Sequence, residues 1–162
     1  MLRYASMRSM DTTNAIGIHT SIFLQGCNFH CKNCWNESTW DLNGGKELTK
    51  DLQNKFIKLS KNDFITGISI LGGEPFVQPK EELNNFLKRL KDEVAKPLFL
   101  WTGYTFKDIP NKEALHYIDV LIDGRFIEEL KDYRLQLRGS SNQKIINVQK
   151  TLKKGKIVLW KN

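Results

Sequence analysis

The three cysteines of the chain, Cys27, Cys31 and Cys34, stand within eight residues of one another. An odd number of thiols in one tight group is poorly suited to disulfide pairing and well suited to binding a metal. Thiolates separated by three and then two residues can curl around one cuboidal [4Fe–4S] cluster, each binding one iron. Such clusters ordinarily take four cysteines. The spacing therefore predicts a cluster with one iron left open, and an open position is typical of a catalytic metal.

A zinc site is the main alternative, with His30 as the fourth ligand beside the cysteines. His30 directly precedes Cys31, inside the loop that the cysteines would have to wrap. No histidine pair and no second Cys-x2-Cys follow, as structural zinc motifs usually require. Three unrelated buried thiols form another alternative, which the regular spacing argues against. The pattern favours the iron–sulfur cluster, and no metal chemistry is expected of His19, His30 or His116.

Polar or glycine-rich turns follow three apolar runs, at Gly72-Gly73-Glu74, at Thr102 and at Asp123. In open parallel sheets and barrels, ligands bind at the carboxyl edge where such turns gather. Glycine lets the backbone approach a ligand closely, and Glu74 could offset a positive charge there. Each turn also has a purely structural interpretation, since glycine pairs, threonine and aspartate commonly form turns and helix caps.

Hydrophobic periodicity places the elements that would position these groups. Apolar runs predict strands at residues 16–24, 64–71, 97–101 and 118–122, with two less regular ones at 144–148 and 156–160. Amphipathic stripes predict helices at residues 48–60, capped by Thr49, and at 79–94, with a short helical stretch at 111–117.

Apolar strands that alternate with amphipathic helices indicate parallel βαβ units. The chain has 162 residues, whereas a full eightfold barrel takes about 250. We therefore expect an α/β fold of one compact domain, residues 1–162, built as a partial, open parallel β/α barrel. Its core would span about residues 14–148, with the C-terminal tail as a candidate edge strand.

The composition narrows the partners and the compartment. The net charge is +7, from 25 basic and 18 acidic residues, which favours acidic partners. No interleaving of basic and aromatic residues indicates nucleic-acid binding. The polar N-terminus lacks a signal core, and no apolar run approaches the roughly 20 residues of a membrane span. We expect a cytoplasmic protein that binds neither nucleic acid nor membrane.

Several motifs, taken in order, carry a family resemblance. The Cys-x3-Cys-x2-Cys spacing and the Gly-Gly-Glu-Pro segment at 72–75 resemble the radical S-adenosylmethionine superfamily. Four further segments are similar to the family of activating proteins of anaerobic (class III) ribonucleotide reductase, over about residues 14–146. They are CWNESTW at 34–40, LWTGY at 100–104, DVLIDGRF at 119–126 and RGSSNQ at 138–143. The chain departs from the usual family residues at 15–17, His19, Asn33 and Trp35, which leaves the cluster ligands intact.

The resemblance implies a specific chemistry. S-adenosylmethionine would bind the open iron and be cleaved reductively, and the 5′-deoxyadenosyl radical would generate a glycyl radical on the large subunit of the anaerobic reductase. A flavodoxin-like protein is the expected electron donor. Cys27, Cys31 and Cys34 would bind the metal. The residues expected to bind S-adenosylmethionine are Asn33, Cys34, Trp35, Gly72, Gly73, Glu74, Thr102, Asp123, Arg138 and Asn142.

Two other functions remain open at this point. The chain could be a different radical S-adenosylmethionine enzyme, which activates another glycyl-radical enzyme or acts on a small molecule. It could also be a non-enzymatic electron-transfer module. For Trp35 and Phe29, packing beneath the cysteine segment is as good an interpretation as stacking on adenine or shielding the cluster.

Overall fold

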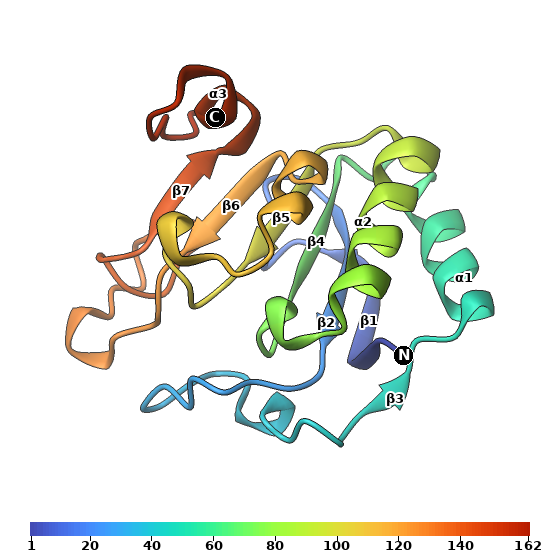
Figure 1. Ribbon diagram of the computed structural model, residues 1–162, viewed down its shortest axis with the longest axis horizontal. Coiled ribbons are helices and arrows are strands. Elements are labelled where there is room, and N and C mark those ends of the chain that lie inside the picture. The colour runs from blue at the N-terminus through green and yellow to red at the C-terminus, as the bar shows by residue number, and fades with distance from the viewer.

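The computed structural model describes all 162 residues and contains one seven-stranded sheet with the order β3-β1-β2-β4-β5-β6-β7 (Figure 1). Strands β2, β4, β5 and β6 run parallel, and β1, β3 and β7 are antiparallel to their neighbours. The edge strands β3 and β7 do not pair with each other, so the sheet is open. The strands are β1 (Arg3–Asp11), β2 (His19–Leu24), β3 (Lys46–Glu47), β4 (Gly67–Gly72), β5 (Leu98–Trp101), β6 (Val120–Asp123) and β7 (Lys144–Asn147).

Two helices, α1 (Lys50–Ser60) and α2 (Lys80–Val94), lie side by side against the sheet (Figure 1). The buried stripe of α2 packs with Phe56 of α1 and with the strands in one core cluster of 23 residues. Thr49 caps α1 by accepting a hydrogen bond from the Leu52 N–H. Both helices were predicted from their apolar periodicity, and both predictions are confirmed. The stretch Lys112–Tyr117 is helical too, as a 3₁₀ helix, η4.

The predicted parallel βαβ arrangement is found in the four central strands, and the sheet is mixed because antiparallel strands flank them. Residues 1–13 were expected to lie outside the core, but they hold β1, which pairs with β2 and β3. Two irregularities interrupt its register with β2. Because an irregular strand loses the alternation of apolar and polar residues, β1 left no period-2 pattern to read.

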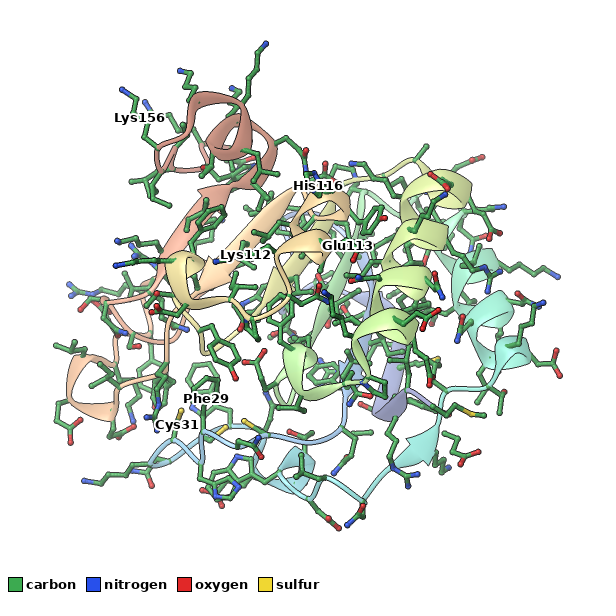
Figure 2. The ribbon with its side chains drawn as sticks, viewed as in Figure 1. Phe29, Cys31, Lys112, Glu113, His116 and Lys156 are labelled. Carbon is green, nitrogen blue, oxygen red and sulfur yellow. The ribbon has the colours of Figure 1, made fainter.

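The C-terminal region differs from its prediction. Helix α3 (Val148–Lys154) follows β7 directly, and Asn147 caps it. Residues 156–160 lie beside β7, but they pair with it through one isolated bridge, between Ile146 and Leu159, and form no full strand. Six lysines and no acidic residue occur in residues 144–162. Helix α3 and Lys156 lie at the end of the sheet opposite Cys31 (Figure 2).

His19 is buried in the sheet at the start of β2. Its Nδ1 lies 2.8 Å from Ser69 Oγ, and the Ser69 hydroxyl donates to the Asn14 carbonyl. Asp11 on β1 is its cross-strand neighbour. Burial lowers the pKa of His19 to about 4, although Asp11 favours the charged form. His19 is therefore a neutral structural residue.

The shorter elements are 3₁₀ turns near the loops of the sheet edge, η1 (Glu37–Thr39), η2 (Pro75–Val77), η3 (Phe106–Asp108) and η5 (Glu128–Leu130). None of the helices is both long and apolar enough to cross a membrane.

Candidate functional site

The four parallel strands end at one edge of the sheet, where two long loops meet. The cysteine loop, residues 26–40, follows β2, and a second loop, residues 125–142, follows β6; we call the latter the flap. A cavity of about 390 Å³ lies between them, and its lining includes all three cysteines. This volume is within the range of small-molecule sites, which is about 300–1,000 Å³.

Backbone hydrogen bonds close the cysteine loop at its base. The Gly26 N–H donates to the Thr39 carbonyl at 2.7 Å, and the Cys27 N–H donates to the Trp40 carbonyl at 3.1 Å. Between these points His30 and Asn33 adopt positive φ angles of 47° and 56°. Left-handed residues reverse the chain direction. They therefore help to turn a short segment so that its three thiols face one cavity.

Two of the sulfur atoms accept backbone hydrogen bonds. The Phe29 N–H lies 3.5 Å from Cys27 Sγ, and the Asn36 N–H lies 3.4 Å from Cys34 Sγ. Hydrogen bonds of this kind stabilise a thiolate ligand and help to set the potential of a cluster. Burial raises the pKa of the free Cys27 thiol. Metal binding overcomes this preference, because it deprotonates the ligand directly.

The zinc alternative finds no support in the geometry. His30 stacks on Trp40, with ring centroids 4.6 Å apart. No group of three or more His, Cys, Asp or Glu side chains is placed to hold a single metal ion. A cuboidal cluster differs from one ion, because its cysteines bind separate irons and need not converge on a point. The donor set of three facing thiols, with no fourth cysteine, therefore fits the cluster better.

Gly72 and Gly73 line the cavity, but the structure gives their small size a different reason from the expected approach to a ligand. A Cβ on Gly72 would lie 2.6 Å from the Leu24 carbonyl oxygen, and one on Gly73 would lie 2.2 Å from the Gly26 carbonyl oxygen. The chain's own backbone thus fills both positions. This close approach lets the Glu74 N–H donate to the Gly26 carbonyl at 2.7 Å. The two glycines allow the end of β4 to lie directly against the start of the cysteine loop.

Glu74 is only 1% exposed and joins the turn after β4 to the turn after β5. Its carboxylate accepts hydrogen bonds from the Thr102 hydroxyl at 2.9 Å, the Gly103 N–H at 2.8 Å and the Phe76 N–H at 3.0 Å. Burial raises the pKa of Glu74 to about 7, although these donors favour the charged form. A cation bound in the cavity would shift the balance toward the carboxylate.

Most of the other predicted residues also line the cavity, namely Cys34, Trp35, Thr102 and Arg138. Three predicted residues do not line it. Asp123 accepts hydrogen bonds from the backbone N–H groups of Phe106 and Lys144. Asn142 donates to the Arg125 carbonyl. Asn33 is an exposed residue at a left-handed turn. Local backbone bonding thus explains the placement of Asp123 and Asn142, and turn geometry that of Asn33.

The comparisons with known proteins are consistent over nearly the whole chain. A family model described as a 4Fe-4S single cluster domain matches residues 13–146. An anaerobic ribonucleoside-triphosphate reductase-activating protein of Vibrio cholerae is 37% identical over 150 residues, which cover 89% of this chain and 97% of that protein. This chain belongs to that family of activating proteins. The relatives of the same name from bacteriophage T4 and Escherichia coli K12 are 34% and 33% identical, and the matches cover 93% and 96% of their lengths.

The cavity borders one buried polar group that has no hydrogen-bond partner. Trp40 lines the cavity, and the indole Nε1–H of Trp40 is buried without a hydrogen-bond partner. A buried donor without a partner is costly unless something binds to it. The Nε1 atom has almost no accessible surface, so the indole N–H is enclosed by protein and does not open into the cavity.

Phe29 also lines the cavity but is held by protein contacts. The Arg125 guanidinium lies 5.2 Å from its ring and donates to its carbonyl at 2.7 Å, and Tyr104 packs against the ring edge. Phe29 and Cys31 lie close together at the site end of the sheet (Figure 2). Phe29 therefore fixes the cysteine loop against the first residue of the flap.

Several residues that line the cavity were not predicted from the sequence. Thr13 and Asn14, which precede β2, and Trp101 line the cavity, as do Phe126 and Tyr133 of the flap. Trp101 belongs to the LWTGY segment and precedes the predicted residue Thr102, so its place in the cavity could have been predicted from the sequence. The flap gives no extended helical or strand period, because its regular structure consists of the short 3₁₀ helix η5 and one bridge, between Lys131 and Ser140. No local pattern could have assigned Tyr133.

Proposed function

We propose that this chain is a radical S-adenosylmethionine enzyme that activates an anaerobic ribonucleoside-triphosphate reductase by forming a glycyl radical on it. Cys27, Cys31 and Cys34 would hold a [4Fe–4S] cluster with one open iron, and S-adenosylmethionine would occupy the adjoining cavity. The observation that carries the proposal is the shared cavity of three thiols and the Gly72–Glu74 turn. The names of the curated relatives identify the reductase as the partner.

When bound, the cluster would supply the electron for reductive cleavage of S-adenosylmethionine, and the hydrogen atom to be removed would come from a glycine of the partner. The chain's residues do the remaining work. The backbone N–H groups of Phe29 and Asn36 stabilise the thiolate charge of two ligands. Glu74 lies in the wall with a carboxyl group suited to balance the ammonium charge of the methionine end.

The four parallel strands support the finer fold assignment that we propose, a partial barrel of the radical S-adenosylmethionine type. In such barrels the ligand lies at the carboxyl ends of the strands, which is where the cavity is found. Asn33, Asp123 and Asn142 remain candidates only for indirect roles, through the loops that they shape. Arg138 stays a candidate ligand residue, although its guanidinium also donates to the Gln143 carbonyl.

A flavodoxin-like protein is the electron donor that we propose. The excess of basic residues, a net charge of +7, suits an acidic protein partner of this kind because opposite charges speed encounter.

Anaerobic reconstitution with iron and sulfide tests the proposal directly. After reduction with dithionite, S-adenosylmethionine should change the EPR signal of the cluster and yield 5′-deoxyadenosine. Addition of the cognate reductase should then give a glycyl radical. If S-adenosylmethionine leaves the EPR signal of the cluster unchanged, the chain is an electron-transfer module instead. If the chain cleaves S-adenosylmethionine but forms no radical on the reductase, it is a different radical S-adenosylmethionine enzyme.

A further inference from the structure

Two exposed aromatic side chains face each other across the mouth of the cavity. Trp35 comes from the cysteine loop, directly after Cys34, and Tyr133 comes from the flap. Their rings are nearly parallel, at 5°, with centroids 6.2 Å apart. Both residues line the cavity, yet Trp35 is 65% exposed and Tyr133 is 77% exposed. The pair thus belongs to the interior wall and to the outer surface at once.

The flap and the cysteine loop are joined more firmly elsewhere than at this pair. Arg125 donates to the Phe29 carbonyl at 2.7 Å and covers the Phe29 ring. Lys32 and Glu129 form an exposed ion pair at 3.8 Å, which contributes little in water. Stacking of two aromatic rings favours contact by only about two- to tenfold. A partner that binds at the mouth can therefore separate the rings without detaching the flap at its base.

The flap beside the pair carries both exposed apolar side chains and charges that are already paired, and Lys131 Nζ lies 5.4 Å from the Tyr133 ring. Ile127 and Leu130 of the flap are also exposed. The neighbouring charges form ion pairs within the flap, Lys131 with Glu128 and Arg134 with Asp132. A surface of this composition suits a polypeptide segment more than a nucleic acid or an anionic membrane. Those would favour the lysine-rich C-terminal segment, in which α3 and Lys156 lie at the opposite end of the sheet.

We propose that Trp35 and Tyr133 form an aromatic gate through which the glycine-bearing segment of the reductase enters the cavity. This inference rests on the proposed function. Without the partner, the stacked rings narrow the opening and keep water and small hydrogen donors from the radical. When the partner docks, its segment separates the rings and packs against them. Exposed Trp and Tyr residues are the side chains that most often anchor protein interfaces. A glycine-centred segment is also narrow enough to pass between two rings.

The central variant is Tyr133→Ala, with Tyr133→Phe as the conservative change that keeps the ring. Phe64→Ala is a matched control, because Phe64 is 52% exposed but lies outside the cavity. Each holoprotein would be compared for cluster absorbance, for the KM values of S-adenosylmethionine and of the reductase, and for the number of glycyl radicals formed per 5′-deoxyadenosine.

For Tyr133→Ala we expect a KM for the reductase raised about tenfold, fewer radicals per 5′-deoxyadenosine, and more 5′-deoxyadenosine formed without the reductase. Tyr133→Phe and Phe64→Ala should match the unmodified chain. The gate is refuted if Tyr133→Ala keeps normal coupling and a normal KM for the reductase. It is also refuted if Trp35→Ala raises only the KM for S-adenosylmethionine, since Trp35 would then serve that ligand alone.

These outcomes separate the gate from the function on which it rests. If the unmodified chain forms no 5′-deoxyadenosine, the proposed function fails before the variants are compared. If the unmodified chain gives a glycyl radical and Tyr133→Ala behaves identically to it, only the gate fails.

Discussion

Replacement of Gly73 by alanine tests how the site is assembled. The added Cβ would lie 2.2 Å from the Gly26 carbonyl oxygen and 3.1 Å from the Thr39 carbonyl oxygen. Both obstacles are backbone atoms, so no side chain can rotate away. To restore a separation of at least 3.0 Å, the end of β4 and the start of the cysteine loop must move apart by about 0.8 Å. Forced overpacking of this kind costs about 1–3 kcal/mol of stability.

The displaced segment carries Cys27, which is bonded to Gly26, so the effect should reach the cluster. A misplacement of about 1 Å at a reacting centre can lower the rate about 100-fold. We therefore expect Gly73→Ala to lower the urea midpoint of the apoprotein and to reduce 5′-deoxyadenosine formation by about 10- to 100-fold.

Gly155→Ala is the control for Gly73→Ala. Gly155 has a positive φ of 65° and nothing within 4 Å of its Cβ position. Its replacement should cost about 1–2 kcal/mol through backbone strain alone and leave the cluster unchanged. If Gly73→Ala were as stable and as active as the unmodified chain, the close packing of β4 against the cysteine loop would be refuted.

Three further predictions follow from single side chains. Cys31→Ala should abolish the broad visible absorbance of the reconstituted cluster while far-UV circular dichroism of the apoprotein persists; retained absorbance would contradict its role as a ligand. Thr102→Val removes the hydroxyl that donates to buried Glu74, so urea unfolding should show a loss of about 1–3 kcal/mol, whereas Thr102→Ser should be nearly neutral. The pKa of His19 is about 4 in the folded chain, against an ordinary value of 6.5 that applies to the unfolded chain. Between these values the unfolded chain binds a proton that the folded chain does not. The free energy of unfolding should therefore fall by at most about 3 kcal/mol from pH 7 to pH 4. His19→Asn should flatten that slope and His116→Gln, at an exposed position, should not; equal slopes for His19→Asn and the unmodified chain would disprove the assignment.

Local signals determined much of the fold. Helices α1 and α2 and the four central parallel strands follow from periodicity and from turn residues at their ends. The antiparallel strands β1 and β7 could not be assigned their direction in this way, because strand direction depends on which neighbour is available. Helix α3 has few buried residues, so its pattern was weak: only Val148 and Thr151 are buried in it.

The sequence by itself determined the candidate ligands, since the spacing of Cys27, Cys31 and Cys34 is a local property of eight consecutive residues. The surroundings of those ligands were decided by the tertiary structure. Only the fold brings the Gly26 carbonyl against Gly73, sets Glu74 against Thr102, and places Tyr133 opposite Trp35. Each of these contacts joins residues far apart in the chain. Their proximity arises from the parallel strands, which end at the same edge of the sheet, and no local pattern encodes it.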